Sequence, residues 1–178
     1  MSTMTPVRDP IGKIDPAFSD PAASPTPWWE ARQFLESAQI YWLSTVRSDG
    51  RPHVTPMAGV WVDDAMHVTT GDDEQRRRNL AANAHCVLTT GCSGMTGTDV
   101  VVEADAEEVI DLGRLQVVVE AIASKYRNTF PYEVGDGHLK MKDRKDSVVR
   151  CYRLRAHKVF GFKKDDPVAQ TRWDFEGA

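Results

Sequence analysis

The sequence lacks several features that would assign it to a common class of protein. Its 178 residues include only three cysteines, which is too few for a disulfide framework. No apolar run approaches the roughly 18 residues of a membrane span, and the N-terminus has no apolar core of a secretory signal. The net charge of −4 argues against nucleic acid as the main partner, because that partner favours a basic surface. We therefore expect a cytoplasmic protein with no membrane span.

Familiar catalytic and metal-binding motifs are missing as well. Neither GxGxxG nor GxxxxGK[ST] is present, and Ser44 lacks the GxSxG context of a serine hydrolase. The histidines form no metal-spaced pair, and Cys86 and Cys92 belong to no CxxC motif, so no metal site is predicted and the cysteines are expected to be buried thiols. The catalytic residues stay unknown. Because the chain is short of nucleophiles and bases, we expect a bound cofactor to carry any chemistry.

What the sequence does contain is a series of short β-forming runs joined by turn-forming residues. Short hairpin connections and alternating apolar residues predict a mainly β fold with flanking helices, built on an antiparallel sheet or barrel. The strands are expected at residues 41–47, 51–62, 65–70, 86–90, 100–110 and 148–162.

Helical periodicity and composition divide the rest of the chain. A first helix is expected to begin at Thr26 and Pro27, with the threonine as N-cap, and two more at residues 75–82 and 112–126. Residues 1–27 contain six prolines and few large apolar groups, so they predict an extended or disordered arm before a single domain at 28–178. The polar residues 127–146 predict a surface loop, and residues 170–175 a tail.

The strongest functional signal lies in residues 40–80. Thr69 and Thr70 end the third expected strand, and the arginines at 76–78 follow on the first turn of a helix. Guanidinium groups match phosphate oxygens, and a helix N-terminus adds backbone donors, so this arrangement predicts a phosphate clamp. The alternative is a solvated basic face whose arginines pair with the acidic residues 72–74.

Several segments together resemble a known family. The resemblance is to the pyridoxamine 5′-phosphate oxidase-like split-barrel flavoproteins, in particular to their flavin- or deazaflavin-dependent oxidoreductases of actinobacterial type. It covers nearly all of the chain except the proline-rich arm. The segments are WLSTVRSDGRPHVTPM (42–57), HVTTG (67–71), RRRNLAANAHCVLTTG (76–91), YRN (126–128) and FGFKKDDPVAQTRWDF (160–175).

The resemblance implies a six-stranded antiparallel split β-barrel, usually a homodimer with its cofactors at the subunit interface. The second strand would contact the cofactor ring, the end of the third the phosphate or ribityl chain, and a basic residue before the NL dipeptide the phosphate. An arginine and a tryptophan near the C-terminus would close over the cofactor of the partner subunit. The implied cofactor-binding residues are Thr55, Pro56, Met57, Ala58, Thr69, Thr70, Arg76, Arg77, Asn79, Arg172 and Trp173.

The function implied by the resemblance is that of an oxidoreductase. Hydride would pass between coenzyme F420, with FMN as the alternative, and a small unsaturated or conjugated substrate. The substrate-phosphate signature of pyridoxamine phosphate oxidase itself is not recognisable in this sequence. A function of another class stays open, namely a non-catalytic protein that binds or carries flavin, haem or F420 on the same barrel.

Overall fold

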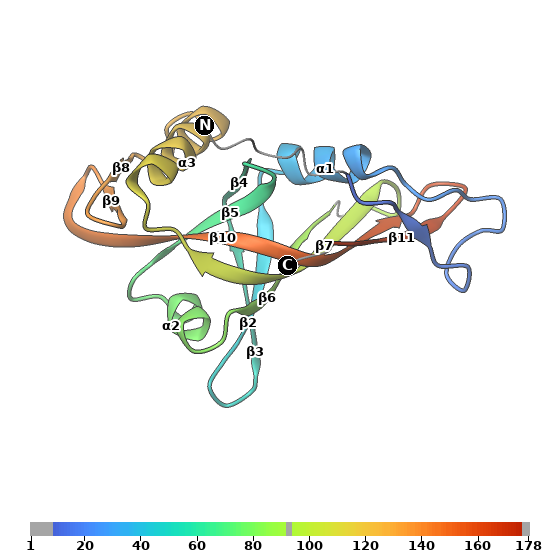
Figure 1. The fold of residues 1–178 in the computed structure, drawn as a ribbon, viewed down its shortest axis with the longest axis horizontal. Coiled ribbons are helices and arrows are strands. Elements are labelled where there is room, and N and C mark those ends of the chain that lie inside the picture. Colours follow the sequence, from blue (N-terminus) through green and yellow to red (C-terminus); the bar gives the residue numbers. More distant parts are fainter. Residues whose placement is uncertain (1–8, 92–93, 176–178) are drawn as a thin grey trace, which may run out of the picture.

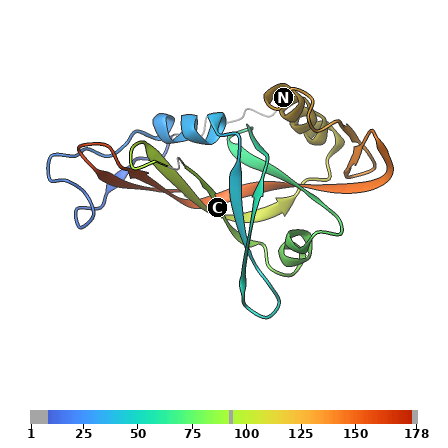
Figure 2. The ribbon, with the colours of Figure 1, turned by 180° about the vertical axis from the view of Figure 1, so that it is seen from behind.

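The structure is a computed structural model, and it describes residues 9–91 and 94–175 except the side chain of residue 145. All strands of the described chain belong to antiparallel pairs of one curved sheet, with three helices around it (Figure 1; Figure 2 from behind). The helices are α1 (Trp28–Ser37), α2 (Gln75–Ala82) and α3 (Leu112–Lys125). The strands are β1 (Lys13–Ile14), β2 (Tyr41–Val46), β3 (Pro52–Met57), β4 (Gly59–Val62), β5 (Ala65–Gly71), β6 (His85–Thr90), β7 (Thr98–Glu108), β8 (Tyr132–Val134), β9 (Leu139–Met141), β10 (Arg144–Lys163) and β11 (Ala169–Asp174).

Strand β10 closes the sheet into a barrel. It pairs with β7, and from β7 the order of neighbouring strands is β6, β2 and β3. Strand β10 also pairs with β5, and β5 pairs with β4. The barrel is split between β3 and β4, which follow each other in the chain without pairing. The expected six-stranded antiparallel split barrel is therefore confirmed, since β3 and β4 together take the place of one long strand.

The split corrects the expectation of an unbroken strand at residues 51–62. The chain changes partner at Ala58, from β2 on the β3 side to β5 on the β4 side. Pro56 has no N–H to donate, and the N–H of Gly59 donates to the Tyr126 hydroxyl at 2.9 Å instead of a neighbouring strand. The break thus depends on a tyrosine 67 residues away in the sequence, which local alternation does not reveal.

Two hydrophobic clusters hold the helices to the barrel. Helix α1 buries Trp28, Ala31 and Leu35 in the first cluster, inside the barrel, and α3 buries Leu115 and other apolar residues against β4 and the β8–β9 hairpin in the second. Burying a side chain such as that of Leu35 contributes about 1.5–3 kcal/mol relative to leaving it exposed. None of the three helices of the described chain is long and apolar enough to cross a membrane.

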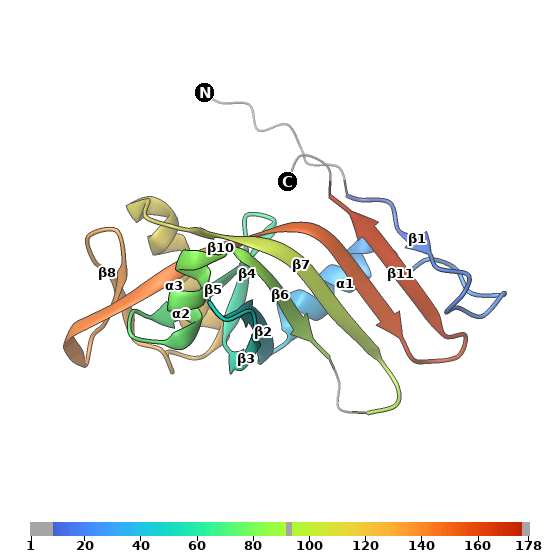
Figure 3. The ribbon, with the colours of Figure 1, turned by 90° about the horizontal axis from the view of Figure 1, so that it is seen from below.

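The described part of the proline-rich arm is ordered against its own chain (Figure 3). Strand β1 pairs with β11, and the N–H of Thr26 donates to the Thr171 hydroxyl at 2.9 Å. Thr26 is therefore not the N-cap of α1. Pro27 holds that position without a side-chain cap, so the expected start of the helix was one residue too early.

Other differences from expectation concern short strands. Residues 127–146 are not a plain loop, because they contain β8, β9 and the start of β10, and the expected tail lies mostly in β11. Strands of three residues are too short to show an alternating pattern. Cys86 and Cys151 are buried thiols as expected, and burial raises the pKa of each to about 12, whereas Cys92 lies outside the described residues.

Candidate functional site

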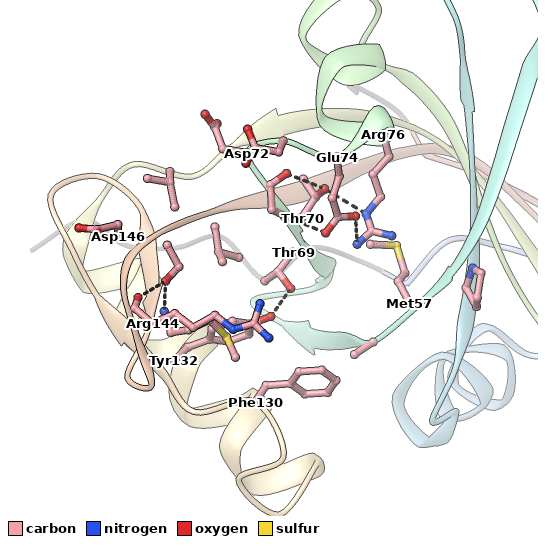
Figure 4. Close-up of a pocket in the computed structure, with 18 residues that line it drawn as sticks. Met57, Thr69, Thr70, Asp72, Glu74, Arg76, Phe130, Tyr132, Arg144 and Asp146 are labelled. Atoms are coloured by element: carbon pink, nitrogen blue, oxygen red, sulfur yellow. Dashed lines mark hydrogen bonds and ion pairs between the residues drawn. The ribbon is translucent and has the colours of Figure 1, made fainter.

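A cavity of about 860 Å³ opens beside the split of the barrel (Figure 4). Residues of the split, of the end of β5 and of the start of α2 line one part of it, and the β8–β9 hairpin with the beginning of β10 lines the other. Of the implied cofactor-binding residues, the structure brings six to this cavity, namely Pro56, Met57, Ala58, Thr69, Thr70 and Arg76. A seventh, Thr55, reaches them through a hydrogen bond to Arg76.

Arg76 is the centre of a polar cluster that three elements contribute to. Its Nε donates to the Thr70 hydroxyl at 3.0 Å, and its Nη1 donates to the Thr55 hydroxyl at 3.3 Å. Its side chain is only 15% exposed, so these contacts hold the guanidinium in one orientation beside the cavity. The structure thus places Thr70 of the expected phosphate clamp beside Arg76, and it brings Thr55, which was expected at the cofactor ring, to the same guanidinium.

The carboxylate of Glu74 lies against the same donors. One of its oxygens accepts the N–H of Gly71 at 2.9 Å, and the other pairs with Nη2 of Arg76 (Figure 4). This ion pair is the one that the alternative of arginines paired with residues 72–74 predicted for Arg76. Phosphate oxygens accept from the same donors, so a phosphate group would bind at Arg76 and the Gly71 N–H only by displacing the Glu74 carboxylate.

Arg77 lies in a different environment from its neighbour. Its Nε contacts Asp72 Oδ1 at 3.1 Å, and Arg150 contacts the same oxygen at 2.9 Å. The hydrogen bond from Arg150, followed by the charges of both arginines, lowers the pKa of Asp72 below its ordinary value. Arg77 does not line the cavity, so for this residue the alternative of a paired basic face is the one that the structure supports.

Asn79 has a structural role within the described chain. Its side chain is 2% exposed, its amide donates to the Thr45 hydroxyl at 2.8 Å, and its carbonyl oxygen accepts from Gln75 at 2.7 Å. Because Thr45 belongs to β2, this contact attaches α2 to the barrel. Asn79 does not line the cavity, and its placement gives no support to a cofactor contact.

The two C-terminal candidates lie away from the cavity of their own chain. Trp173 is fully buried in the first cluster, with its ring centroid 5.6 Å from that of Trp28. This disagrees with its expected contact with a cofactor, because a fully buried indole has no face left for a ligand. Arg172 is exposed on β11 and contacts Asp174, and its reach toward a partner subunit stays a prediction.

Sequence reasoning missed the aromatic wall, which we define as Phe130, Tyr132, Met141 and Arg144. The rings of Phe130 and Tyr132 are stacked, with centroids 6.0 Å apart and planes at 15°, and the Tyr132 hydroxyl lies 3.3 Å from that of Thr69. Burial raises the pKa of Tyr132 above its ordinary value. The clustered aromatic residues of FPY at 130–132 were the available signal, but the polar composition around them indicated a loop.

A half-buried lysine supports the junction behind this wall. Nζ of Lys125 donates to the carbonyl of Gly59 at 3.0 Å and to the Tyr41 hydroxyl at 2.7 Å. The Tyr126 hydroxyl contacts both the N–H and the carbonyl of Gly59, and its ring packs edge-on against Phe130. Burial lowers the pKa of Lys125 to about 8. The position of the split is therefore set from α3.

The comparisons with known proteins agree with this architecture. The family described as pyridoxamine 5′-phosphate oxidase matches residues 28–160. No curated protein matches the chain.

Solved structures of low sequence identity share the fold. A conserved hypothetical protein from Mycobacterium tuberculosis aligns with a TM-score of 0.60 at 22% identity, over 76% of this chain and 84% of that protein. An F420 reductase aligns with a TM-score of 0.54 at 20% identity, over 75% of this chain and 96% of that one. A heme binding protein from Mycobacterium smegmatis aligns with a TM-score of 0.58 at 17% identity, over 79% of this chain and 55% of that protein.

Proposed function

The chain belongs to the pyridoxamine 5′-phosphate oxidase family, and on this premise we propose that it is an oxidoreductase that binds coenzyme F420, or alternatively FMN, in the cavity beside Arg76. The observation that carries the proposal is the convergence of Arg76, Thr55, Thr70 and the Gly71 N–H on one place, where the Glu74 carboxylate already occupies the position of an anion. The similarity to an F420 reductase supports F420 as the first choice.

Each part of the cavity has a distinct task in this proposal. Arg76 and the Gly71 N–H would bind the phosphate, and the split at Met57 and Ala58 would border the ring. When bound, the cofactor supplies two-electron transfer as hydride to a small unsaturated substrate. The aromatic wall excludes water from one side. Tyr132 is the candidate proton donor because it lines the cavity and its hydroxyl lies 3.3 Å from that of Thr69, and since burial raises its pKa it would be a weak acid in this role.

A binding screen tests the cofactor assignment. Purified protein is titrated with F420 and with FMN while fluorescence is followed, and the Arg76→Ala and Arg77→Ala variants are titrated in parallel. We expect Arg76→Ala to weaken binding about 10- to 100-fold, because a charged hydrogen-bonded partner contributes about 1.5–3 kcal/mol. Arg77→Ala should bind like the wild type.

Two results of this screen would contradict the assignment. One is that neither cofactor binds at micromolar concentrations, and the other is that Arg76→Ala binds as tightly as the wild type. A yellow protein as purified, with flavin absorbance, would favour FMN over F420.

We also propose that the protein is a homodimer with a cofactor site at the subunit interface. The exposed apolar residues Trp42 and Val54 support this, because they lie on the outer face of β2 and β3, and Trp42 pairs with the cavity residue Pro56. A partner on this face would border the cavity. Sedimentation should show a dimer that Trp42→Lys weakens, and a wild-type monomer of 19.9 kDa would contradict the shared site.

A second candidate function is that of a non-catalytic carrier of flavin, haem or F420 on the same barrel. The similarity to a heme binding protein supports it. The described residues that line the cavity include neither histidine nor cysteine, but they include Tyr132, Met57 and Met141, whose residue types also ligate haem iron. Tight cofactor binding without oxidation of the reduced cofactor by any acceptor would favour the carrier over the enzyme.

A further inference from the structure

Arg144 lies at a part of the cavity that the phosphate site does not use. It is the first residue of β10 and lines the cavity beside the β8–β9 hairpin, whereas Arg76 belongs to α2. In Figure 4 the guanidinium of Arg144 points inward, toward Thr69 and Tyr132, and Arg76 lies on the other side of Thr69. The cavity therefore has two separate cationic groups.

The backbone of Arg144 is held in place by an irregular turn. The Ser147 hydroxyl donates to the carbonyl of Arg144 at 2.8 Å and accepts the N–H of Met141 at 2.7 Å. The register between β10 and β9 shifts between Arg144 and Val149, as at a β-bulge. Bulges commonly redirect a side chain near a functional site, and here the turn directs Arg144 into the cavity.

The charge of Arg144 is not balanced in the way that the charge of Arg76 is. Within residues 9–91 and 94–175, no carboxylate forms an ion pair with the Arg144 guanidinium, whereas Arg76 pairs with Glu74. Asp146 also lines the cavity, but it points away from the guanidinium of Arg144 (Figure 4). Five donors of the guanidinium are thus available to an anion that enters the cavity.

The neighbours of Arg144 favour a flat ligand. Phe130 and Tyr132, which line the same cavity as Arg144, form a nearly parallel pair of rings at 15° to each other. Aromatic faces bind flat apolar groups, and a guanidinium fork binds a carboxylate through two parallel hydrogen bonds. A cavity of about 860 Å³ lies in the range of about 300–1,000 Å³ that holds a small molecule, with room for a second ligand group.

We propose that Arg144, Phe130 and Tyr132 form a second anion subsite, which binds the carboxylate of a small planar organic acid as substrate. This inference rests on the proposed function, in which the phosphate of the cofactor binds at Arg76. The two arginines then bind different molecules. Arg144 binds the carboxylate, and the rest of the acid extends along Phe130 and Tyr132 toward the part of the cavity lined by Met57 and Ala58.

The test uses 2-naphthoate as a probe and its neutral amide, 2-naphthamide, as the uncharged counterpart. Binding of each to the full chain is measured by calorimetry, with and without cofactor, for the wild type, Arg144→Gln and Lys142→Gln. Lys142 is a matched control, because it is an exposed cation of the same hairpin that does not line the cavity. We expect Arg144→Gln to weaken naphthoate binding at least about tenfold and to abolish the preference over the amide, while Lys142→Gln binds like the wild type.

Other outcomes would overturn either the subsite or the proposed cofactor function. Naphthoate binding that Arg144→Gln leaves unchanged, or that both variants weaken equally, would overturn the subsite. If Arg144→Gln instead weakens F420 or FMN and leaves naphthoate unaffected, the anion belongs to the cofactor and the substrate assignment is overturned. If naphthoate binds in an Arg144-dependent way while neither cofactor binds at all, the subsite stands and the proposed cofactor function fails.

Discussion

The two walls of the cavity are built on different principles. The α2 wall, which we define as Thr70, Gly71, Glu74 and Arg76, comes from seven consecutive positions of the chain, and its charges neutralise each other. The aromatic wall comes from the β8–β9 hairpin and the residues on either side of it. Tyr132 contacts the distant Thr69, Phe130 packs against Tyr126, whose hydroxyl contacts Gly59, and the cation of this wall has no such counter-charge among the described residues. The comparison teaches that an anion site can be encoded locally, whereas the shape of the cavity that surrounds it is a tertiary property.

The largest effect is expected from detaching the α2 wall. Asn79→Ala removes a buried amide and leaves the Thr45 hydroxyl with only a 3.3 Å contact to the carbonyl of His53, so the free energy of unfolding should fall by about 2–3 kcal/mol. Urea unfolding measures this change. Arg78→Ala on the exposed face of α2 is the control and should change stability by less than about 0.5 kcal/mol. Equal stabilities of the two variants would show that Asn79 does not anchor α2.

A smaller loss is expected from detaching the aromatic wall. Tyr126→Phe leaves the Gly59 N–H without its hydroxyl partner, which should lower the free energy of unfolding by about 1–2 kcal/mol. Tyr132→Phe loses only a 3.3 Å contact with Thr69 and should cost less. If Tyr132→Phe proved the more costly of the two, the wall would be anchored at β5 and not at the split.

Lys125, which supports the split behind the aromatic wall, gives the stability of the protein a dependence on pH. Its folded pKa of about 8 lies below its ordinary 10.5, so between these values the unfolded chain binds more protons and the free energy of unfolding rises with pH. Lys125→Met should lack this rise. The raised pKa values of Cys86 and Cys151 lower the free energy of unfolding as pH rises, and they do so equally in the wild type and in Lys125→Met. The difference in the free energy of unfolding between the wild type and Lys125→Met, measured from pH 7 to 9.5, therefore isolates the contribution of Lys125. A difference that stays constant over this range would contradict the prediction.

The smallest effect concerns the charge balance of the α2 wall itself. Glu74→Gln keeps the size of the side chain but removes the carboxylate that competes with phosphate for Arg76 and for the Gly71 N–H. We expect the affinity for FMN or F420 to increase about three- to tenfold, in line with the modest energy of a partly exposed ion pair. Glu120→Gln removes an exposed carboxylate of α3 that does not line the cavity, so it is the control and should leave the affinity unchanged. A weaker affinity in Glu74→Gln would mean that Glu74 belongs to the binding site and does not compete with the ligand.

Of the α2 wall, the sequence pointed to Thr70 and Arg76, because the information that brings these two residues together is local. The bounds of α2 agree with the expected 75–82, and Thr70 and Arg76 meet because a strand end and a helix start lie a few residues apart. The split at Ala58 was not predictable from alternation, since the apolar pattern continues through it and the break depends on Tyr126.

The family resemblance predicted that Trp173 contacts the cofactor, whereas in this structure Trp173 lies in the first hydrophobic cluster. Helix α1 brings Trp28 against it, and the two indoles fill the interior of the barrel together. Whether this tryptophan binds a ligand or fills a core depends on the helix that packs over it, which lies more than a hundred residues earlier in the chain.

Strand β10 has a consequence for how the molecule unfolds. Its residues Leu154 and Val159 belong to the first hydrophobic cluster, whereas Val149 and Cys151 belong to the second. Because one continuous strand contributes to both clusters, neither can lose its packing without disturbing the strand that the other depends on. Thermal unfolding in a calorimeter should therefore follow a single cooperative transition, with equal calorimetric and van't Hoff enthalpies.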